Sequence, residues 1–177
     1  TVPGGSGSCR ANDQSTWVWN GSSNRNPAIA LLFYLLGWKI NGKLAVGRGI
    51  PAARIDLESF ITAANLCDET VGKGTGGTEP RYRCDGVWSE GDDPKIVIDA
   101  LKACMHADLD DAGGRLRLTV MHNDLASPVA SFGDDQILSG LKWEQTPSLV
   151  DTFNIVRGTY TDSSANSLYQ LVDYPEV

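Results

Sequence analysis

The pattern of apolar and polar residues predicts a buried helix near the start of the chain. Asn26 followed by Pro27 is a strong helix start, because Asn caps free N–H groups and Pro suits the first helical position. Residues 27–36 are apolar on nearly all sides, and Gly37 follows them as a helix terminator. This pattern predicts a helix that is covered on more than one side.

Two amphipathic helices are predicted further along. Asp56 is the expected N-cap of the first, and its apolar stripe consists of Leu57, Phe60, Ile61, Ala64 and Cys67. Asp93-Pro94 repeats the combination of cap and proline. The helix after it is expected to direct inward Ile96, Val97, Ala100, Leu101 and Cys104.

Alternating residues predict strands, which dominate the last third of the chain. Strands are expected at residues 16–20, 81–87, 115–121, 137–144, 151–160 and 168–174, with a turn at 110–114 and a hairpin loop at 161–166. Helices in the first two thirds and strands in the last third indicate an α+β fold. We expect two or three helices packed on antiparallel sheets.

The domain organisation follows from the same patterns. Residues 1–15 are small and polar and are expected to form a linker or loop, and residues 16–177 form the folded region. A finer division would place a helical and mixed part at 16–125 and a β part at 126–177. Both ends look like cuts through a longer polypeptide, so we expect a segment of a larger protein.

Composition excludes two classes of function. Fifteen Lys and Arg against 22 Asp and Glu give a net charge of −7, which argues against a protein that binds nucleic acid through its phosphates. The longest apolar run is residues 28–36, about half of what a membrane-spanning helix requires. The chain is 41% hydrophobic and 21% charged, which favours a folded domain over a disordered one.

The four cysteines, Cys9, Cys67, Cys84 and Cys104, are widely spaced and form no CxxC pair. This excludes a zinc ribbon or a thioredoxin-like site. We interpret them as mostly buried thiols of a chain that folds in a reducing cytoplasm, with a Cys67–Cys84 disulfide as the alternative.

Two motifs resemble ligand sites, and both fit a loop better. Gly72, Gly74 and Gly77 match GxGxxG, but no helix is predicted directly after them to receive a pyrophosphate. Asp108, Asp110 and Asp111 resemble the start of an EF-hand, but the fifth position is Ala and the twelfth is Thr. We expect a flexible loop at the first motif and a solvated turn at the second.

Catalytic candidates are few. His106 is predicted at a helix end, where the helix dipole alone favours it. His122 and Asp124 could form a dyad, but no nucleophile motif accompanies them. The tryptophans fit an aromatic core or a subunit interface better than a sugar-binding ladder; they are Trp17, Trp19, Trp38, Trp88 and Trp143. We therefore expect no catalytic residue, no cofactor and no metal site.

A family resemblance rests on five segments that occur in a fixed order. They are residues 26–36, 55–69, 79–84, 95–105 and 151–160, the last followed by Tyr169-Gln170. Together they resemble the central hub region of the tail-tip, host-specificity protein J family of long-tailed bacteriophages. The resemblance covers residues 16–177. Residues 38–50 are longer than the corresponding loop of that family, which suggests a divergent relative such as a prophage or a gene-transfer particle.

The resemblance implies a structural, non-enzymatic virion protein. Such hubs are homotrimers at the tail tip, where they contact other baseplate proteins and join the tail tube to the receptor-binding fibre. They take part in host attachment and genome delivery, and they assemble in the bacterial cytoplasm. Two alternatives remain open from the residues alone. One is a module that binds a host-surface glycan or protein through exposed tryptophans, and the other is a tail-associated peptidoglycan hydrolase.

Overall fold

The computed structural model describes residues 25–73, 76–89, 91–122, 130–140, 148, 152–162 and 169–174. The chain divides into two compact units, Thr1–Leu125 and Ala126–Val177, and each is described by itself. The strand predicted at residues 16–20 lies outside the described residues.

The first helix forms where the sequence predicts it. Helix α1 (Pro27–Leu36) begins after Asn26, whose side-chain oxygen accepts hydrogen bonds from the N–H groups of Ala28 and Ile29. The Asn26 amide also donates to the carbonyl of Ala64 in the second helix, at 2.9 Å. Gly37 ends α1 with a positive φ of 71° and an N–H bond to Phe33. The buried Asn26 side chain therefore both caps α1 and connects it to α2.

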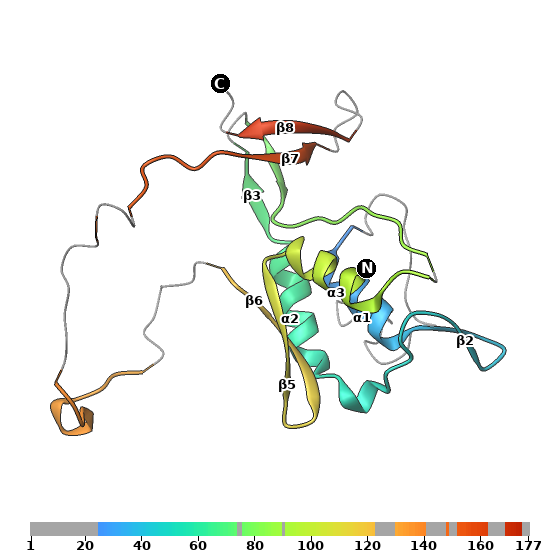
Figure 1. Ribbon diagram of the computed structural model, residues 1–177, viewed down its shortest axis with the longest axis horizontal. Helices are drawn as coiled ribbons and strands as arrows, with labels where there is room; N and C mark the ends of the chain where they lie inside the picture. Colours follow the sequence, from blue (N-terminus) through green and yellow to red (C-terminus); the bar gives the residue numbers. More distant parts are fainter. Residues whose placement is uncertain are drawn as a thin grey trace. The chain divides into compact units, whose positions relative to one another are not determined.

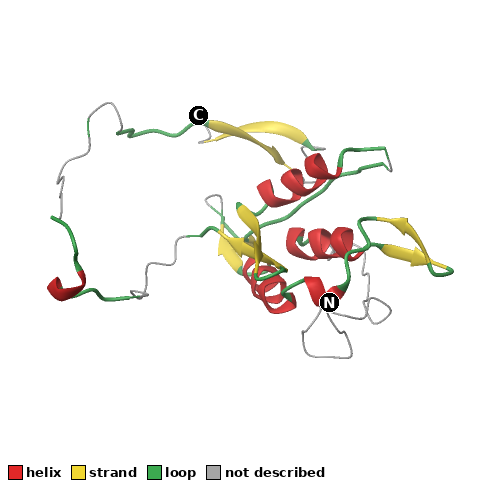
Figure 2. Ribbon diagram, turned by 60° about the horizontal axis from the view of Figure 1, so that its bottom comes forward, coloured by secondary structure: helices red, strands yellow, loops and turns green. Residues whose placement is uncertain are grey.

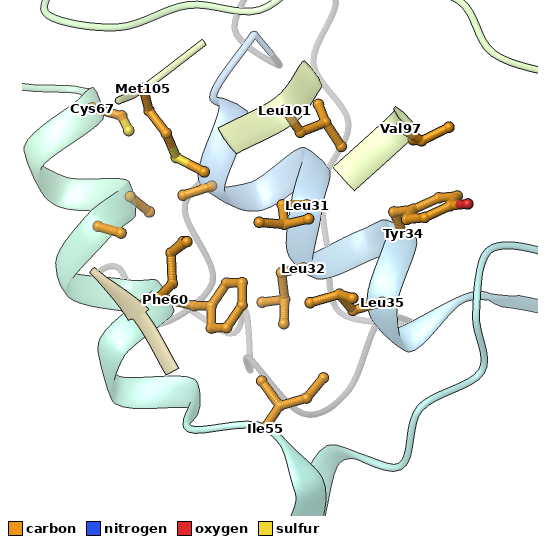
Figure 3. Close-up of a cluster of buried hydrophobic side chains, with 14 residues drawn as sticks. Leu31, Leu32, Tyr34, Leu35, Ile55, Phe60, Cys67, Val97, Leu101 and Met105 are labelled. Carbon is orange, nitrogen blue, oxygen red and sulfur yellow. The ribbon is translucent and has the colours of Figure 1, made fainter. Parts of the chain in front are cut away.

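Helix α1 lies between the other two helices, α2 (Leu57–Cys67) and α3 (Pro94–Ala103). Figure 3 shows Leu32 of α1 close to Phe60 of α2, and Leu101 of α3 beside Leu31. No residue of α1 is fully exposed, which confirms that this helix is covered on several sides. The core consists of Ala28, Leu31, Leu32, Tyr34, Leu35, Ile55, Phe60, Ala63, Ala64, Cys67, Val97, Leu101, Met105 and Leu118.

Two antiparallel hairpins are built on two-residue turns. Strands β1 (Trp38–Ile40) and β2 (Lys43–Val46) are joined by Asn41-Gly42, and both turn residues have positive φ. Strands β5 (Ala107–Ala112) and β6 (Arg115–Val120) are joined in the same way by Gly113-Gly114. The turn predicted at 110–114 is therefore shorter, because residues 110–112 continue β5. The β1–β2 hairpin, which the sequence patterns did not predict, extends away from the helices (Figures 1 and 2).

The β5–β6 hairpin packs on α2. Its inner face carries Leu109 and Leu118, which lie opposite each other in the register, and β6 contacts α2. Beside β6, Ile55 makes a parallel bridge to Leu116, directly after a short 3-10 helix, η3 (Ala52–Arg54). The alternation predicted for residues 115–121 is thus confirmed as a strand with one buried face.

The prediction for residues 81–87 was wrong. The strands in this region are β3 (Thr70–Gly72) and β4 (Thr78–Pro80), which pair with each other. Residues 81–87 form no ladder, because their backbone N–H groups bond to separate parts of the chain. Tyr82 donates to the Cys67 carbonyl, and Cys84 donates to that of Arg25.

In the second unit, a short 3-10 helix, η4 (Asp134–Gln136), is followed by an antiparallel pair, β7 (Gly158–Asp162) and β8 (Gln170–Tyr174). The pair was predicted, but β7 begins later than expected and includes Thr161 and Asp162. Residues 137–140 are not a strand, so that prediction fails for its described part; residues 141–144 lie outside the described residues.

The described residues therefore form an α+β structure of three helices and small antiparallel sheets. Among them, no helix has the length and apolar character needed to cross a bilayer.

Candidate functional site

The first unit contains a groove with a volume of about 810 Å³. It lies along α1 and α3, and its walls are completed by residues 84–88, by Asp92 and Asp93, and by the β1–β2 hairpin. Its lining consists of Ala30, Phe33, Trp38, Val46, Cys84, Asp85, Gly86, Val87, Trp88, Asp92, Asp93, Ile96, Val97, Ala100, Leu101 and Cys104. Apolar and aromatic side chains dominate this list.

The α3 wall differs from its prediction. Val97 and Leu101 are buried in the core, as expected. Ile96, Ala100 and Cys104 are not inward, and Ile96 is 67% exposed. These three residues follow one another at intervals of four, so they form a second apolar strip on the helix. That strip lines the groove, which means that α3 has more apolar surface than its contact with α1 covers.

Aromatic rings form the opposite walls. The ring centroids of Phe33 and Trp38 are 6.1 Å apart, with a tilted geometry. Tyr34 and Trp88 meet edge to face at 5.8 Å. Edge and tilted contacts of this kind hold aromatic side chains in fixed positions. The groove therefore presents two positioned indole rings, Trp38 at its β1 end and Trp88 at the end of residues 84–88.

The apolar lining continues along the β1–β2 hairpin. Trp38 and Ile40 are two residues apart in β1, and Val46 pairs with Trp38, so all three share one face. All three are exposed. Leu44 is on the other face, where its methyl groups lie against the backbone of Gly37 and Gly49. The hairpin thus adds an apolar face to the groove and is fixed to α1 by Leu44.

The acidic residues of the groove already have hydrogen-bond partners. Asp85 forms a two-point ion pair with Arg25. Asp93 accepts from the Lys95 N–H as the N-cap of α3, and Asp92 accepts from the Ser89 N–H. These bonds connect the carboxylates to other residues of the groove walls and their surroundings.

Two thiols, Cys84 and Cys104, line the groove, and a third, Cys67, is buried in the neighbouring core. Cys67, Cys84 and Cys104 are all free, so the alternative of a Cys67–Cys84 disulfide is not present. Burial raises the pKa of Cys84 to about 12, and the neighbouring Cys104 and Asp85 add to this effect. Burial likewise raises the pKa of Cys67 to about 11. A thiol must ionise to act as a nucleophile, so these groups behave as apolar surface near neutral pH.

The cysteines are less buried than predicted. Cys67 is buried, Cys84 is half-buried and Cys104 is exposed. Cys104 is exposed because it follows the end of α3, on the same strip as Ile96 and Ala100. Cys9 lies outside the described residues.

The two motifs that resemble ligand sites have structural positions. Gly72 ends β3 and Gly77 precedes β4, so GxGxxG joins two antiparallel strands; Gly74 lies outside the described residues. Asp108, Asp110 and Asp111 belong to strand β5, where no calcium loop can form. Asp108 also pairs with Lys102, and Asp111 with Arg54.

Neither histidine lines the groove, whereas two of the tryptophans do. His106 follows α3 in a left-handed conformation, and its carbonyl accepts from Met121. His122 is exposed just after β6, and Asp124 lies outside the described residues. Trp38 and Trp88 line the groove, whereas Trp17, Trp19 and Trp143 lie outside the described residues. Where the structure is described, no three His, Cys, Asp or Glu residues are placed to hold a metal ion.

The groove was not predicted, although the sequence contained two signals for it. The apolar positions of α3 cover a wider arc than one neighbouring helix can bury. Asn41-Gly42, between short apolar runs, is a typical type I′ hairpin signal. The sequence matches no protein-family model and no curated protein.

Proposed function

We propose that this chain is a structural component of the tail tip or baseplate hub of a long-tailed bacteriophage. In this role it would form a homotrimer, contact other tail proteins and link the tail tube to the receptor-binding fibre. It would serve host attachment and genome delivery without catalysing a reaction. The proposal starts from the ordered segments that resemble the tail-tip family, three of which include α1, α2 and α3.

One observation supports this function most strongly: the apolar surface of the second unit. No large apolar side chain in its described part is buried, and Leu138, Phe153 and Leu171 are 99%, 78% and 72% exposed. The other exposed members are Phe132, Ile137, Ile155, Val156, Tyr160, Tyr169 and Tyr174. Apolar surface on this scale is typical of a chain that completes its core with partner chains.

The β7–β8 pair supports the same interpretation. A two-stranded hairpin is marginal in water without further strands or a helix to cover it. Both of its edges carry backbone groups that can pair with another chain. A symmetric hub, in which neighbouring subunits supply strands and side chains, would satisfy these groups.

The net charge of the chain is compatible with a hub through which DNA passes. A net charge of −7 gives the chain no general attraction for the phosphate backbone, so DNA leaving through the hub would not be retained. A binding protein for nucleic acid would need the opposite balance.

Immunogold electron microscopy can test the proposal. Particles would be induced from the bacterium that carries the gene and labelled with an antibody raised against the purified chain. We expect gold at the tail end distant from the capsid. Gold on the capsid or along the tail tube, or particles without label, would contradict a tail-tip position.

The same particles provide the control. An antibody against the major tail-tube protein should label the whole tail, which establishes that the tail surface is accessible. Disrupting the gene should then remove the tip label and leave the tube label unchanged. Tails that assemble and keep the tip label without this gene would overturn the proposal.

A further inference from the structure

The groove has more apolar wall than the described residues cover. The strip of Ile96, Ala100 and Cys104 on α3, and the aromatic walls at Trp38 and Trp88, all face it. Water in contact with such a surface is unfavourable at about 25 cal/mol per Å². A segment with a matching apolar face would therefore be stabilised there.

We infer that the Trp17-Val18-Trp19 segment of this same chain docks in the groove, with both indole rings directed into it. The inference goes beyond the proposed function and does not depend on it. The occupant is an intramolecular strap, which would make the groove part of the folding core of the first unit.

The attachment point of residues 1–24 favours this occupant. Arg25, the first described residue, is fixed to the groove wall twice. Its guanidinium pairs with Asp85, and its carbonyl accepts from the N–H of Cys84. Asp85 and Cys84 both line the groove. The chain that precedes Arg25 therefore starts at the rim.

The chain between Arg25 and the two tryptophans is long enough to place both of them in the groove. Trp19 lies six positions before Arg25 and Trp17 lies eight positions before it, which correspond to at most about 22 and 29 Å of extended chain. Helix α1, which runs along the groove, is ten residues or about 15 Å long. Gly21 and the serine and asparagine residues beside it favour a turn that would reverse the chain toward α1.

The side chains of the Trp17-Val18-Trp19 segment also suit an apolar groove. In an extended segment Trp17 and Trp19 project to the same side and Val18 to the other. Two indoles bury about 150–250 Å² each, so the pair could cover much of an apolar groove. Among residues 1–24, these three are the concentrated apolar group. A strap at this position would contact Phe33 and Ile96 from opposite walls.

Alkylation of the groove thiols can test the inference on the full 177-residue chain. Iodoacetamide labelling of Cys84 and Cys104 would be followed by mass spectrometry for the unaltered chain, for the double variant Trp17→Ala, Trp19→Ala, and for Val18→Ala. We expect labelling of Cys84 to accelerate about tenfold in the double variant, equivalent to about 1.4 kcal/mol of docking free energy. Val18→Ala, altered on the opposite side of the strap, should resemble the unaltered chain.

A second variant keeps the test decisive if the double variant does not fold. Ile96→Asn places a polar, uncharged side chain in the groove at a residue that is already exposed, so the core should remain intact and no new charge changes the ionisation of Cys84. It should also accelerate the labelling of Cys84. Equal labelling rates in all variants would overturn the inference. Protection of Cys84 that is lost on dilution would assign the strap to a second copy and would also overturn the intramolecular arrangement.

Discussion

At the scale of single residues, Asn26 connects local and tertiary structure. It is only 7% exposed, and it caps α1 through its oxygen while its amide nitrogen bonds to the Ala64 carbonyl of α2. A helix cap contributes about 0.5–2 kcal/mol, and the additional hydrogen bond to the Ala64 carbonyl, which also accepts from the Asp68 N–H, contributes about 0.5–1.5 kcal/mol. The sequence predicted the cap, but the bond to α2 required knowledge of the packing.

Substitution of Asn26 can separate these two contributions. Asn26→Ser keeps a capping oxygen and loses the bond to Ala64, so we expect a loss of about 1 kcal/mol in unfolding free energy. Asn26→Ala loses both and should cost about 1 kcal/mol more. Urea unfolding measures the difference. Equal losses for the two variants would show that the capping oxygen contributes nothing.

Two thiols, Cys67 in the core and Cys84 in the groove wall, give the first unit a pH dependence on the alkaline side. The pKa of Cys67 and of Cys84 rises from the ordinary value of 9.0 to about 11 and about 12. The folded state therefore favours the protonated thiol, and this stabilisation is complete below pH 9 and is lost as the pH rises toward 11 and 12.

This dependence can be measured with a cysteine variant. We expect the thermal midpoint of the unaltered chain to fall between pH 9 and pH 11 more steeply than that of the double variant Cys67→Ala, Cys84→Ala. Lys and Tyr titrate in the same range, so the difference between the two chains is the relevant quantity. Parallel curves would contradict the role of the thiols.

At the scale of elements, the contact between α1 and the β1–β2 hairpin depends on glycine. Gly47 has a φ of 86°, and a Cβ atom there would overlap the Tyr34 carbonyl. Gly42, in the hairpin turn, has a φ of 77°, but a Cβ atom there would meet nothing within 4 Å. Both glycines therefore have a left-handed backbone conformation, but only Gly42 has room for a Cβ atom.

This pair forms a matched experiment. Gly42→Ala should cost about 1 kcal/mol, the usual penalty of a left-handed alanine. Gly47→Ala should cost about 2 kcal/mol more, because the Tyr34 end of α1 or the hairpin must also shift. Denaturant unfolding measures both. Equal losses would show that the hairpin moves away from α1 at no cost.

A second element contact joins α2 to β6 through a hydroxyl group. Ser59 donates to the Asp56 carbonyl at 2.7 Å and accepts from the N–H of Leu118 at 3.0 Å. Leu118 is buried, so Ser59→Ala leaves its N–H without this acceptor and should destabilise the chain by about 1–3 kcal/mol. Thr62→Ala, at an exposed position of α2, is the control and should cost under about 0.5 kcal/mol. If Ser59→Ala lost no more unfolding free energy than the control, the Ser59 hydroxyl would not contribute to stability.

Helices could be predicted from the sequence because their signals are local. Asn26, Pro27 and Gly37 fix the limits of α1, and Asp93-Pro94 fixes the start of α3. At α2 the N-cap position was correct, but the Asp56 carboxylate makes no capping bond and pairs with Arg117 instead. Partners distant in sequence decide such details.

The strands and the groove were less predictable for the same reason. Alternation at 81–87 resembles a strand, but a ladder needs a neighbouring strand, and the backbone there bonds to Arg25 and Cys67 instead. The groove depends on which part of the α3 surface α1 covers, and that is set by the crossing of the two helices. Ile96 and Val97 are adjacent in the sequence, and only their positions in the fold separate a groove residue from a core residue.

At the scale of the whole molecule, the two units differ in how they are stabilised. The first has a core around α1, whereas the described apolar side chains of the second are left exposed. We propose that a unit of the second kind gains its stability by association, with its apolar residues as contact surface. This difference suits a subunit that is rigid at one part and completed by its neighbours at another.

Self-association of the purified chain tests this division. We expect sedimentation to reveal species larger than the monomer that increase with concentration, since apolar surface of this extent favours association. Phe153→Ser together with Leu171→Ser should shift the distribution toward the monomer and leave the unfolding of the first unit unchanged. Thr161→Ser, a conservative change in β7, should alter neither property. If the unaltered chain stays monomeric at every concentration, or if the double variant associates equally well, the exposed apolar residues of the second unit are not a contact between copies.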